Sequence, residues 1–316
     1  MKIQSRSLKD YLILVAKGFS MGASDVVPGV SGGTMAFILG IYEELIESIR
    51  TFLSPSALKL VFTFKFKEAF TSLPWPFLLA LVTGMLTAVF SLARFLEWML
   101  DDHPSLIWSF FFGLVLASIL MVTKRVKQWN AATLAAVMIG AIVAWVIVGL
   151  VPAEMPHTAL FLFGSGFIAI CAMILPGISG SFILVLLGQY EYILSAVNNR
   201  DFVTLLLVAA GAIIGLGTFA QVLGWLFKRY HDVTVAVLIG FMAGSLRKIW
   251  PWKGTLSTTT DRHGVEVPLE QINMLPADLT ANVALALILA VVGFGAVIFI
   301  DYLGSRKEKL AEPASA

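Results

Sequence analysis

A shortage of metal-binding and redox side chains narrows the function of this chain first. The sequence has a single cysteine, Cys171, which excludes a disulfide within the chain and a metal site built from cysteines. Its four histidines are far apart and show neither H-x-x-H nor H-E-x-x-H spacing, so no histidine metal centre is predicted. We therefore expect no metal and no cofactor.

Charge is scarce as well. Charged residues make up 13% of the 316 residues, about half the roughly 25% that is usual in soluble domains. The net charge of +2 is too small to indicate nucleic acid as a partner. The basic N-terminal residues are not followed by a cleavable pattern of small residues, so we interpret them as part of the mature protein.

Apolar residues are abundant instead. They make up 58% of the chain, and the mean hydropathy is +0.88. Several windows of about 20 apolar residues lie between short charged loops, which is the pattern of helices that span a bilayer. The sequence thus predicts an all-α polytopic membrane protein, with tryptophans near the span ends as interfacial belts.

An internal repeat is the strongest pattern in the sequence. A shift of 148 residues aligns Pro28–Glu44 with Pro176–Tyr192 and gives eight identities in seventeen positions. Further along, a shift of 127 residues aligns Gly84 with Gly211 and Gly113 with Gly240. The two shifts differ by 21 residues, which matches an extra segment at 51–71 in the first copy. The chain is therefore predicted to be one duplicated unit with an insertion.

Each copy is predicted to hold a helical hairpin followed by three membrane spans. Repeat 1 covers 1–151, with hairpin 11–49, the insert 51–71 and spans near 76–98, 105–123 and 131–151. Repeat 2 covers 152–302, with hairpin 159–197 and spans near 202–227, 233–247 and 279–300, and 303–316 form a cytoplasmic tail that we expect to be disordered. A hairpin returns to the side it came from, so three spans leave the two repeats inverted relative to each other.

The placement of Lys and Arg predicts that both termini are cytoplasmic. With the N-terminus inside, the inner loops collect fifteen of these residues and the outer side six. The 151–157 loop, expected outside, has neither, whereas 247–270 is expected to be a mixed outer loop. The insert alternates apolar and basic residues, as in an amphipathic helix on the inner membrane surface; a packing element is the alternative.

The composition of the first hairpin arm predicts that the hairpin dips into the membrane and returns. Residues 11–27 include Lys17, Asp25, two serines and two glycines. A charge at mid-bilayer on a helix costs roughly 2.5–3.5 kcal/mol, so such an arm is better packed inside the protein, where irregular backbone is tolerated. A tight turn between two ordinary spanning helices is the alternative.

The turn of the first hairpin, PGVSGGT, combines helix-breaking residues with hydroxyls. Proline and glycine interrupt the helix, and Ser31 or Thr34 can cap the next one. The amides of Gly32, Gly33 and Thr34 are then expected to be unpaired donors at a helix N-terminus, where the dipole favours an anion.

The second turn, PGISGS, is expected to build the same device with Ser179, Gly180 and Ser181. Two such helix ends that approach the midplane from opposite faces are typical of secondary transporters. The sequence therefore predicts an anion site near the centre of the membrane.

The run SDVVPGVSGGTMAFILGIYEELI, from Ser24, and its echo LPGISGSFILVLLGQYEYIL, from Leu175, resemble the bacterial polyprenyl-phosphate transporter family. The family was long catalogued as a membrane domain of unknown function, and the resemblance covers essentially the whole chain. It implies a non-enzymatic flippase of the inner membrane that moves undecaprenyl phosphate from the outer to the inner leaflet. The expected partners are this lipid and the surrounding membrane lipids, and the task is recycling of the lipid carrier of cell-wall synthesis.

A positive charge within an apolar segment adds a further candidate. Arg94 is a plausible partner for a lipid phosphate, and the repeat gives Gln221 at its counterpart. The alternative is an interfacial side chain that reaches the surface beside Glu97. The full set of candidate substrate-binding residues is Ser31, Gly32, Gly33, Thr34, Ser179, Gly180, Ser181 and Arg94.

Three carboxylates are candidates for coupling or gating. Asp25 lies three residues before Pro28, where the second copy has Met173, and it is a candidate carrier of a coupling H⁺ or Na⁺ or a cap for backbone amides. Glu43 and Glu191 are repeat equivalents. In a straight helical arm each lies about 18 Å from its own serine, which favours a gating role or simple solvation of a helix end over phosphate contact.

Two other functions stay open at the level of sequence. Membrane undecaprenyl-diphosphate phosphatases have similar hairpins and a Pro-Gly-x-Ser-Arg motif, but here Gly32 and Gly180 follow the serines. The arginine that would stabilise a phosphoryl transition state is therefore missing. A small-anion or ion-coupled secondary transporter is the other alternative.

Overall fold

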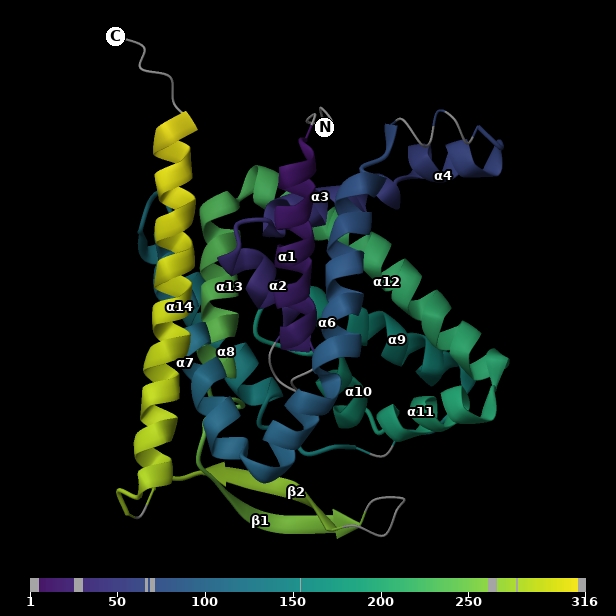
Figure 1. Cartoon of the computed structure of the whole chain (residues 1–316). Helices are drawn as coiled ribbons and strands as arrows, with labels where there is room; N and C mark the ends of the chain where they lie inside the picture. The colour runs from purple at the N-terminus through teal and green to yellow at the C-terminus, as the bar shows by residue number, and fades with distance from the viewer. Residues whose placement is uncertain are drawn as a thin grey trace. The chain divides into compact units, whose positions relative to one another are not determined.

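The computed structural model describes residues 6–25, 31–65, 68, 72–153, 155–260, 266–276 and 278–311. Pro28 and Gly29 of the first turn lie outside the described residues. Most of the described chain is helical, which confirms the predicted class (Figure 1). The first half contains α1 (Leu8–Asp25), α2 (Gly32–Ile38), α3 (Tyr42–Phe52), α4 (Pro55–Phe62), α6 (Trp75–Asp102), α7 (Pro104–Thr123) and α8 (Ala131–Ile147). The second half contains α9 (Ala159–Ile174), α10 (Gly180–Leu186), α11 (Tyr190–Asn199), α12 (Phe202–Arg229), α13 (His231–Ser245), β1 (Lys253–Thr260), β2 (Glu266–Asn273) and α14 (Ala281–Ala311).

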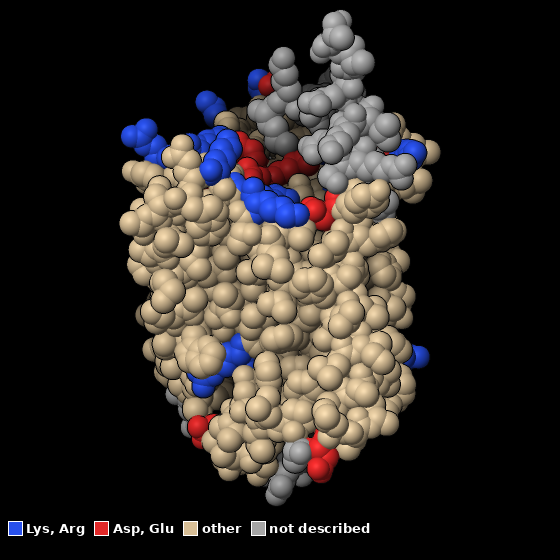
Figure 2. Space-filling model, turned by 90° about the vertical axis from the view of Figure 1, so that its left-hand side faces the viewer, with Lys and Arg blue, Asp and Glu red and all other residues tan. Residues whose placement is uncertain are grey.

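Several helices are long and apolar enough to cross a membrane. Within the described residues these are Trp75–Leu92 of α6, Pro104–Thr123, Phe202–Arg229 and Ala281–Tyr302, and the bent pair α10–α11 makes a fifth candidate. Helices α8, α9 and α13 are apolar but shorter. Figure 2 shows that uncharged side chains cover most of the face in view, as expected for a surface in contact with lipid.

Capping residues and a proline in the sequence mark where several of these helices begin. Pro104 occupies the first turn of α7, where its missing N–H costs nothing. Asn130 and Thr133 form a capping box at the start of α8. The Asp201 carboxylate accepts hydrogen bonds from the amides of Val203 and Thr204 at the start of α12. These caps satisfy amides that would otherwise lack partners at the helix ends.

The chain divides into two compact units, each of which takes residues from both halves of the sequence. One contains 1–94 and 152–234, and the other contains 95–151 and 235–316. Within the first unit α9 packs along α12, and within the second α7 packs along α14 (Figure 1). The compact units therefore do not coincide with the two predicted repeats.

Close helix contacts in the first unit recur at positions related by the two sequence shifts. At each of four glycines a Cβ atom would lie 1.9–2.2 Å from a backbone oxygen of the facing helix, so only glycine fits. The contacts are Gly18–Leu81 and Gly84–Val15 between α1 and α6, and Gly166–Val208 and Gly211–Phe163 between α9 and α12.

The second unit shows a similar recurrence, in which Gly113 and Gly240 are related by the shift of 127 residues but Gly140 and Gly293 by a shift of 153. Here a Cβ atom on the glycine would lie 1.9–2.4 Å from the facing backbone oxygen. The contacts are Gly113–Ala290 and Gly293–Phe110 between α7 and α14, and Gly240–Val137 and Gly140–Val237 between α13 and α8. Helix pairs of this kind gain van der Waals contact from the close backbone approach, as in many membrane proteins.

The second arm of each hairpin is broken. Gly40 lies between α2 and α3 with φ of 71°, and Gly188 lies between α10 and α11 with φ of 62°. Both values fall in the left-handed region that favours glycine, and α10 and α11 meet at an angle of 105°. The expectation of straight arms to residues 49 and 197 is therefore wrong. The distance of about 18 Å from each serine to Glu43 or Glu191 assumed a straight helix, so that assumption does not hold here.

Two further segments differ from expectation. The outer loop predicted at 247–270 contains β1 and the first part of β2, and the two strands pair antiparallel with Lys253 opposite Asn273. The tail is not disordered throughout, because α14 continues to Ala311. In the insert, α4 places Ala57 in a small cluster with Leu73, whereas residues 66, 67 and 69–71 lie outside the described residues. Contact of the insert with the membrane surface stays a prediction.

Candidate functional site

The tips of the two hairpins contact each other within the first unit. The Ser31 hydroxyl donates to the carbonyl oxygen of Met173 at 3.2 Å. In the other direction, the Gly177 amide donates to Thr34 Oγ1 at 2.9 Å. The Tyr42 hydroxyl donates to the carbonyl oxygen of Ile174 at 3.1 Å. Ser31, Thr34 and Tyr42 are buried, so these hydrogen bonds are shielded from water and hold the two tips together.

The first turn of α2 is fully paired. The Gly32 amide donates to Asp25 Oδ1 at 2.6 Å, the Gly33 amide to Ser31 Oγ at 3.1 Å, and the Thr34 amide to the Ser31 carbonyl oxygen at 2.9 Å. The expectation that these three amides are unpaired is therefore wrong. Asp25 caps the helix, as one of its two readings predicted, and its carboxylate takes the place that an external anion would take.

The second tip is built differently. Ser179 precedes α10 but forms no capping hydrogen bond through its side chain; its hydroxyl lies 2.7 Å from that of Ser181. Among the described residues, no hydrogen bond acceptor faces the Gly180 and Ser181 amides. The aligned position of Asp25 is Met173, which has no carboxylate to cap these amides. The equivalence of the two devices expected from the repeat is therefore wrong.

Two functional side chains in this region escape the motif analysis. The Lys17 ammonium of α1 donates to the carbonyl oxygen of Leu39 at 2.8 Å, at the C-terminal end of α2, where a positive charge is favourable. Tyr42 aligns with Tyr190, yet Tyr42 is fully buried and Tyr190 is 41% exposed. The sequence could have singled out Lys17, because it is a charge within an apolar arm. Nothing in the sequence indicates that Tyr42 is buried and Tyr190 is exposed.

The glutamates of α3 and α11 lie in the first turn of each helix. Glu43 Oε1 is 3.3 Å from His231 Nε2, and Glu191 is exposed. The neighbouring Glu44 pairs with Arg6 at 2.5 Å. Within the part of the chain that is described, the contact of Glu43 is thus with α13 and not with the tip residues.

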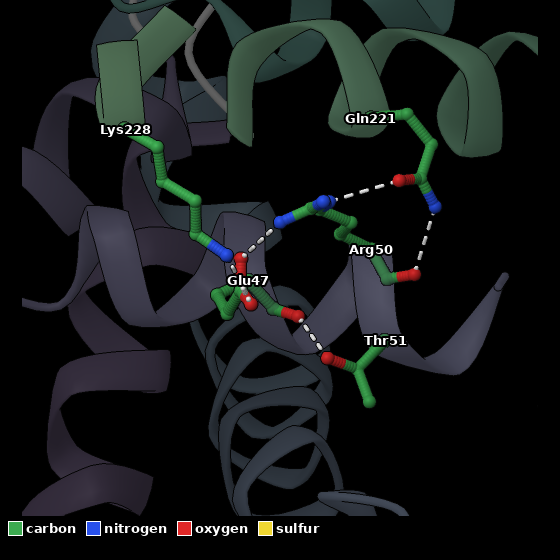
Figure 3. A network of polar contacts seen from close by, with 5 residues as sticks. All are labelled: Glu47, Arg50, Thr51, Gln221 and Lys228. Atoms are coloured by element: carbon green, nitrogen blue, oxygen red, sulfur yellow. Dashed lines mark hydrogen bonds and ion pairs between the residues drawn. The ribbon is translucent and has the colours of Figure 1, made fainter. Parts of the chain in front are cut away.

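A third glutamate of α3, Glu47, organises a polar network with α12 (Figure 3). Its carboxylate is 3.1 Å from both Lys228 Nζ and Arg50 Nη1. Arg50 Nε also donates to Gln221 Oε1 at 2.8 Å, and Gln221 Nε2 donates back to the Arg50 carbonyl oxygen at 3.1 Å. Partial burial alone would raise the pKa of Glu47, but the hydrogen bonds and charges of Lys228 and Arg50 lower it below its ordinary value.

Arg94 forms no hydrogen bond or ion pair with the tip residues within the described residues. It is exposed on α6 and, among the described residues, forms no ion pair with Glu97 or any other carboxylate. Its repeat counterpart, Gln221, contacts Arg50 instead. The same described part of the chain contains no group of three or more metal-ligating side chains.

Comparison with known proteins identifies the family. A family model described as undecaprenyl phosphate translocase-like matches residues 21–267. A polyprenyl-phosphate transporter of Vibrio cholerae serotype O1 is 44% identical over 303 residues, which cover 95% of this chain and 98% of that protein. A polyprenyl-phosphate transporter of Staphylococcus aureus is 32% identical over 257 residues, which cover 76% of this chain and 86% of that protein. No solved structure matches the chain.

Both relatives are named as transporters and neither as an enzyme, which agrees with the interpretation of the chain as a non-enzymatic membrane transporter. The matched region includes both hairpin tips and extends over more than half of the chain. The protein therefore belongs to the undecaprenyl phosphate translocase-like family.

Proposed function

We propose that this protein carries polyprenyl phosphate, of the undecaprenyl phosphate type, from the outer to the inner leaflet of the bacterial cytoplasmic membrane. The observation that carries the substrate is the 44% identity, over nearly the full length of both chains, to a polyprenyl-phosphate transporter. The biological purpose would be return of the lipid carrier to cell-wall synthesis.

The energetic problem of this reaction lies in the headgroup. The isoprenoid tail stays in the hydrocarbon throughout, whereas moving a bare ion of phosphate size into a medium of low dielectric costs on the order of 20 kcal/mol in an idealised estimate. Hydroxyls and amides inside the protein lower this cost by replacing the hydration shell. Buried polar groups at the two hairpin tips supply such donors and acceptors.

We infer that the two halves are inverted repeats with re-entrant hairpins. The support is the recurrence of the glycine contacts: the α1–α6 contacts reappear between α9 and α12, and the α7–α14 contacts reappear between α13 and α8. An exchange of this kind is expected when two copies are related by a two-fold axis in the membrane plane. Together with the Lys and Arg bias, this inference supports a cytoplasmic location for both termini.

The donors at the second tip make it the better phosphate partner. The hydroxyls of Ser179 and Ser181 and the amides of Gly180 and Ser181 have no carboxylate among them in the described structure. At the first tip, Ser31 and Thr34 are engaged across the tip contact. In the transport cycle we expect a phosphate oxygen to take over the Ser31 hydroxyl and the Gly177 amide as the tips separate, with Arg94 compensating charge along the path.

Asp25 supplies a reason for ion coupling. An anion that reaches the Gly32 amide must displace the Asp25 carboxylate, which repels it. Neutralisation of Asp25 by H⁺ or Na⁺ removes that repulsion and frees the Gly32 amide at the same time. Glu43 and Glu191, at the breaks of the hairpin arms, are proposed to take part in gating.

The decisive test uses serines rather than glycines. A Cβ atom at Gly32 would lie 2.5 Å from the Asp25 carboxylate, and one at Gly180 would lie 2.8 Å from the carbonyl oxygen of Ala169. The substitutions Gly32→Val and Gly180→Val would therefore disturb the turn even without substrate. Ser179→Ala and Ser181→Ala remove only a hydroxyl each.

We expect Ser179→Ala and Ser181→Ala to weaken undecaprenyl phosphate binding about five- to a hundred-fold, since each loses one hydrogen bond to a charged group. Transport into the inner leaflet of reconstituted vesicles should fall in parallel. Ser165→Ala is the matched control, because the Ser165 hydroxyl is buried on α9 but bonds to its own helix at the Leu162 carbonyl. Wild-type transport in both tip variants would exclude this tip as the phosphate site, and a wild-type protein that moves no polyprenyl phosphate would refute the function.

A further inference from the structure

A group of positive side chains lies at the base of the β-hairpin, in the second compact unit. Arg247 and Lys248 follow the end of α13, and Lys253 begins β1. All three are half-buried. Lys253 Nζ donates to the carbonyl oxygen of Lys248, so the two lysines are held next to each other.

Aromatic rings hold two of these cations in place. Lys253 Nζ lies 5.2 Å from the centre of the Trp108 ring. The Arg247 guanidinium lies 4.8 Å from the centre of the Trp145 ring and donates to the Trp145 carbonyl oxygen at 3.1 Å. Both distances are in the range of cation–π attraction. Asn273 of β2 fixes the backbone of Arg247 through a hydrogen bond of 2.9 Å to its carbonyl oxygen.

Gly149 has no side chain, and the Arg247 guanidinium occupies the space where a Cβ atom would lie. A Cβ atom at Gly149 would lie 2.1 Å from Arg247 Nη1. The clash would be with the far end of a flexible side chain, so alanine at this position would displace the guanidinium without disturbing the backbone. The position of Arg247 can therefore be changed separately from its charge.

Arg247 and Lys253 are not neutralised by the carboxylates of the described part of the chain. Arg247 and Lys253 are directed to carbonyl oxygens and rings, and neither forms an ion pair with a described carboxylate. Burial and the neighbouring charge of Lys248 lower the pKa of Lys253 to about 8. Holding like charges together in a half-buried site is unfavourable, and a bound anion reverses the sign of that energy.

The surroundings suit a lipid headgroup. Trp250 and Trp252 stack edge-on beside the same turn, with Phe112 against Trp250. Tryptophan is typical of the level where headgroups meet acyl chains, and basic pockets beside spanning helices bind lipid phosphates. A lipid phosphate bound here keeps its acyl chain in the hydrocarbon region. A free inorganic ion has no such chain and would gain less binding energy from the site.

We propose that Arg247, Lys248 and Lys253 form a binding site for the phosphate of a membrane lipid, with Trp108 and Trp145 orienting the cations. The site receives the headgroup at the membrane surface and shares no residue with the hairpin tips. The inference rests on the proposed function only for the identity of the preferred lipid as a polyprenyl phosphate and for the outer leaflet as its location.

Binding of three probes to purified full-length protein in detergent tests this site: undecaprenyl phosphate, phosphatidylglycerol and inorganic phosphate as a competitor. Lys253→Met and Arg247→Gln should each weaken lipid binding about ten-fold or more, because each removes a charge-assisted contact. Gly149→Ala should weaken it in the same direction by moving Arg247. Lys127→Gln is the control, since Lys127 is exposed in the same compact unit. Thermal melts of all variants check folding.

The outcomes separate this inference from the proposed function. If the wild type binds undecaprenyl phosphate and the Lys253, Arg247 and Gly149 variants bind it equally well, the headgroup site is overturned and the transport function stands. If the wild type binds phosphatidylglycerol in a Lys253-dependent way but not undecaprenyl phosphate, the site stands and the proposed substrate fails. Displacement of lipid by inorganic phosphate at equal concentration would show a site for free anions and overturn the lipid assignment.

Discussion

Replacing Thr34 with valine tests whether hydrogen bonds between the tips hold the protein closed. Thr34 is fully buried, and its Oγ1 is the acceptor for the Gly177 amide at 2.9 Å. Valine has nearly the same shape but offers no acceptor, so the Gly177 N–H is left buried without a partner. Leaving a buried donor unsatisfied costs about 1–3 kcal/mol, which shifts the equilibrium between joined and separated tips about five- to 150-fold.

The assay combines a thermal melt with a transport measurement on the same reconstituted protein. We expect Thr34→Val to melt several degrees below the wild type, and Thr34→Ser, which keeps the hydroxyl, to melt between them. If tip separation limits transport, the valine variant should also transport faster per folded molecule, since its closed state is less stable. A valine variant that melts with or above the serine variant would refute the reasoning, because the hydrogen bond would then contribute nothing.

Three further predictions concern other parts of the molecule. Glu47→Gln removes a carboxylate whose pKa is lowered in the folded protein. The stability that Glu47 contributes is present above its ordinary pKa of 4.5 and is lost as the pH falls through the lower folded pKa. Thermal melts across that pH range should therefore show that acid destabilises the wild type more than the variant. Gly113→Ala should impair folding, since its Cβ would lie 1.9 Å from the Ala290 carbonyl oxygen, whereas Gly295→Ala, with open space around it, should melt like the wild type. In a Cys171→Ser background, an impermeant thiol reagent added outside should label a cysteine at position 154 and miss one at position 310, and the reverse pattern would overturn the orientation.

The class of the protein was predictable because it depends on composition. Apolar windows indicate membrane helices whatever their neighbours are, and the family follows from motif residues that a linear comparison detects. The two aligned glycines Gly40 and Gly188 were visible as part of the repeat. Their positive φ was not, because a glycine within an apolar run breaks a helix only where the surrounding packing requires it.

The contacts between the two hairpin tips could not be predicted from the sequence for a different reason. Ser31 and Thr34 meet Met173 and Gly177 across more than 140 residues of chain, and no local pattern specifies such a partner. The first tip was predicted to attract an outside anion, but Asp25, seven residues before Gly32, already supplies one. The β-hairpin was overlooked because its threonine-rich strand reads as a polar loop when charge is the only criterion.

The packing of α7 against α14 has a consequence for biosynthesis. The surface of α7 around Gly113 is shaped to accept the backbone of the last helix of the chain. During translation α7 is inserted long before α14 leaves the ribosome, so this groove must face lipid, or the insertion machinery, until α14 has been made. Helix α1 is in a better position, because its partner α6 follows within the same half of the chain. Docking of α14 thus covers the groove, and a chain that stops before α14 leaves the small-residue surface of α7 exposed to quality-control proteases.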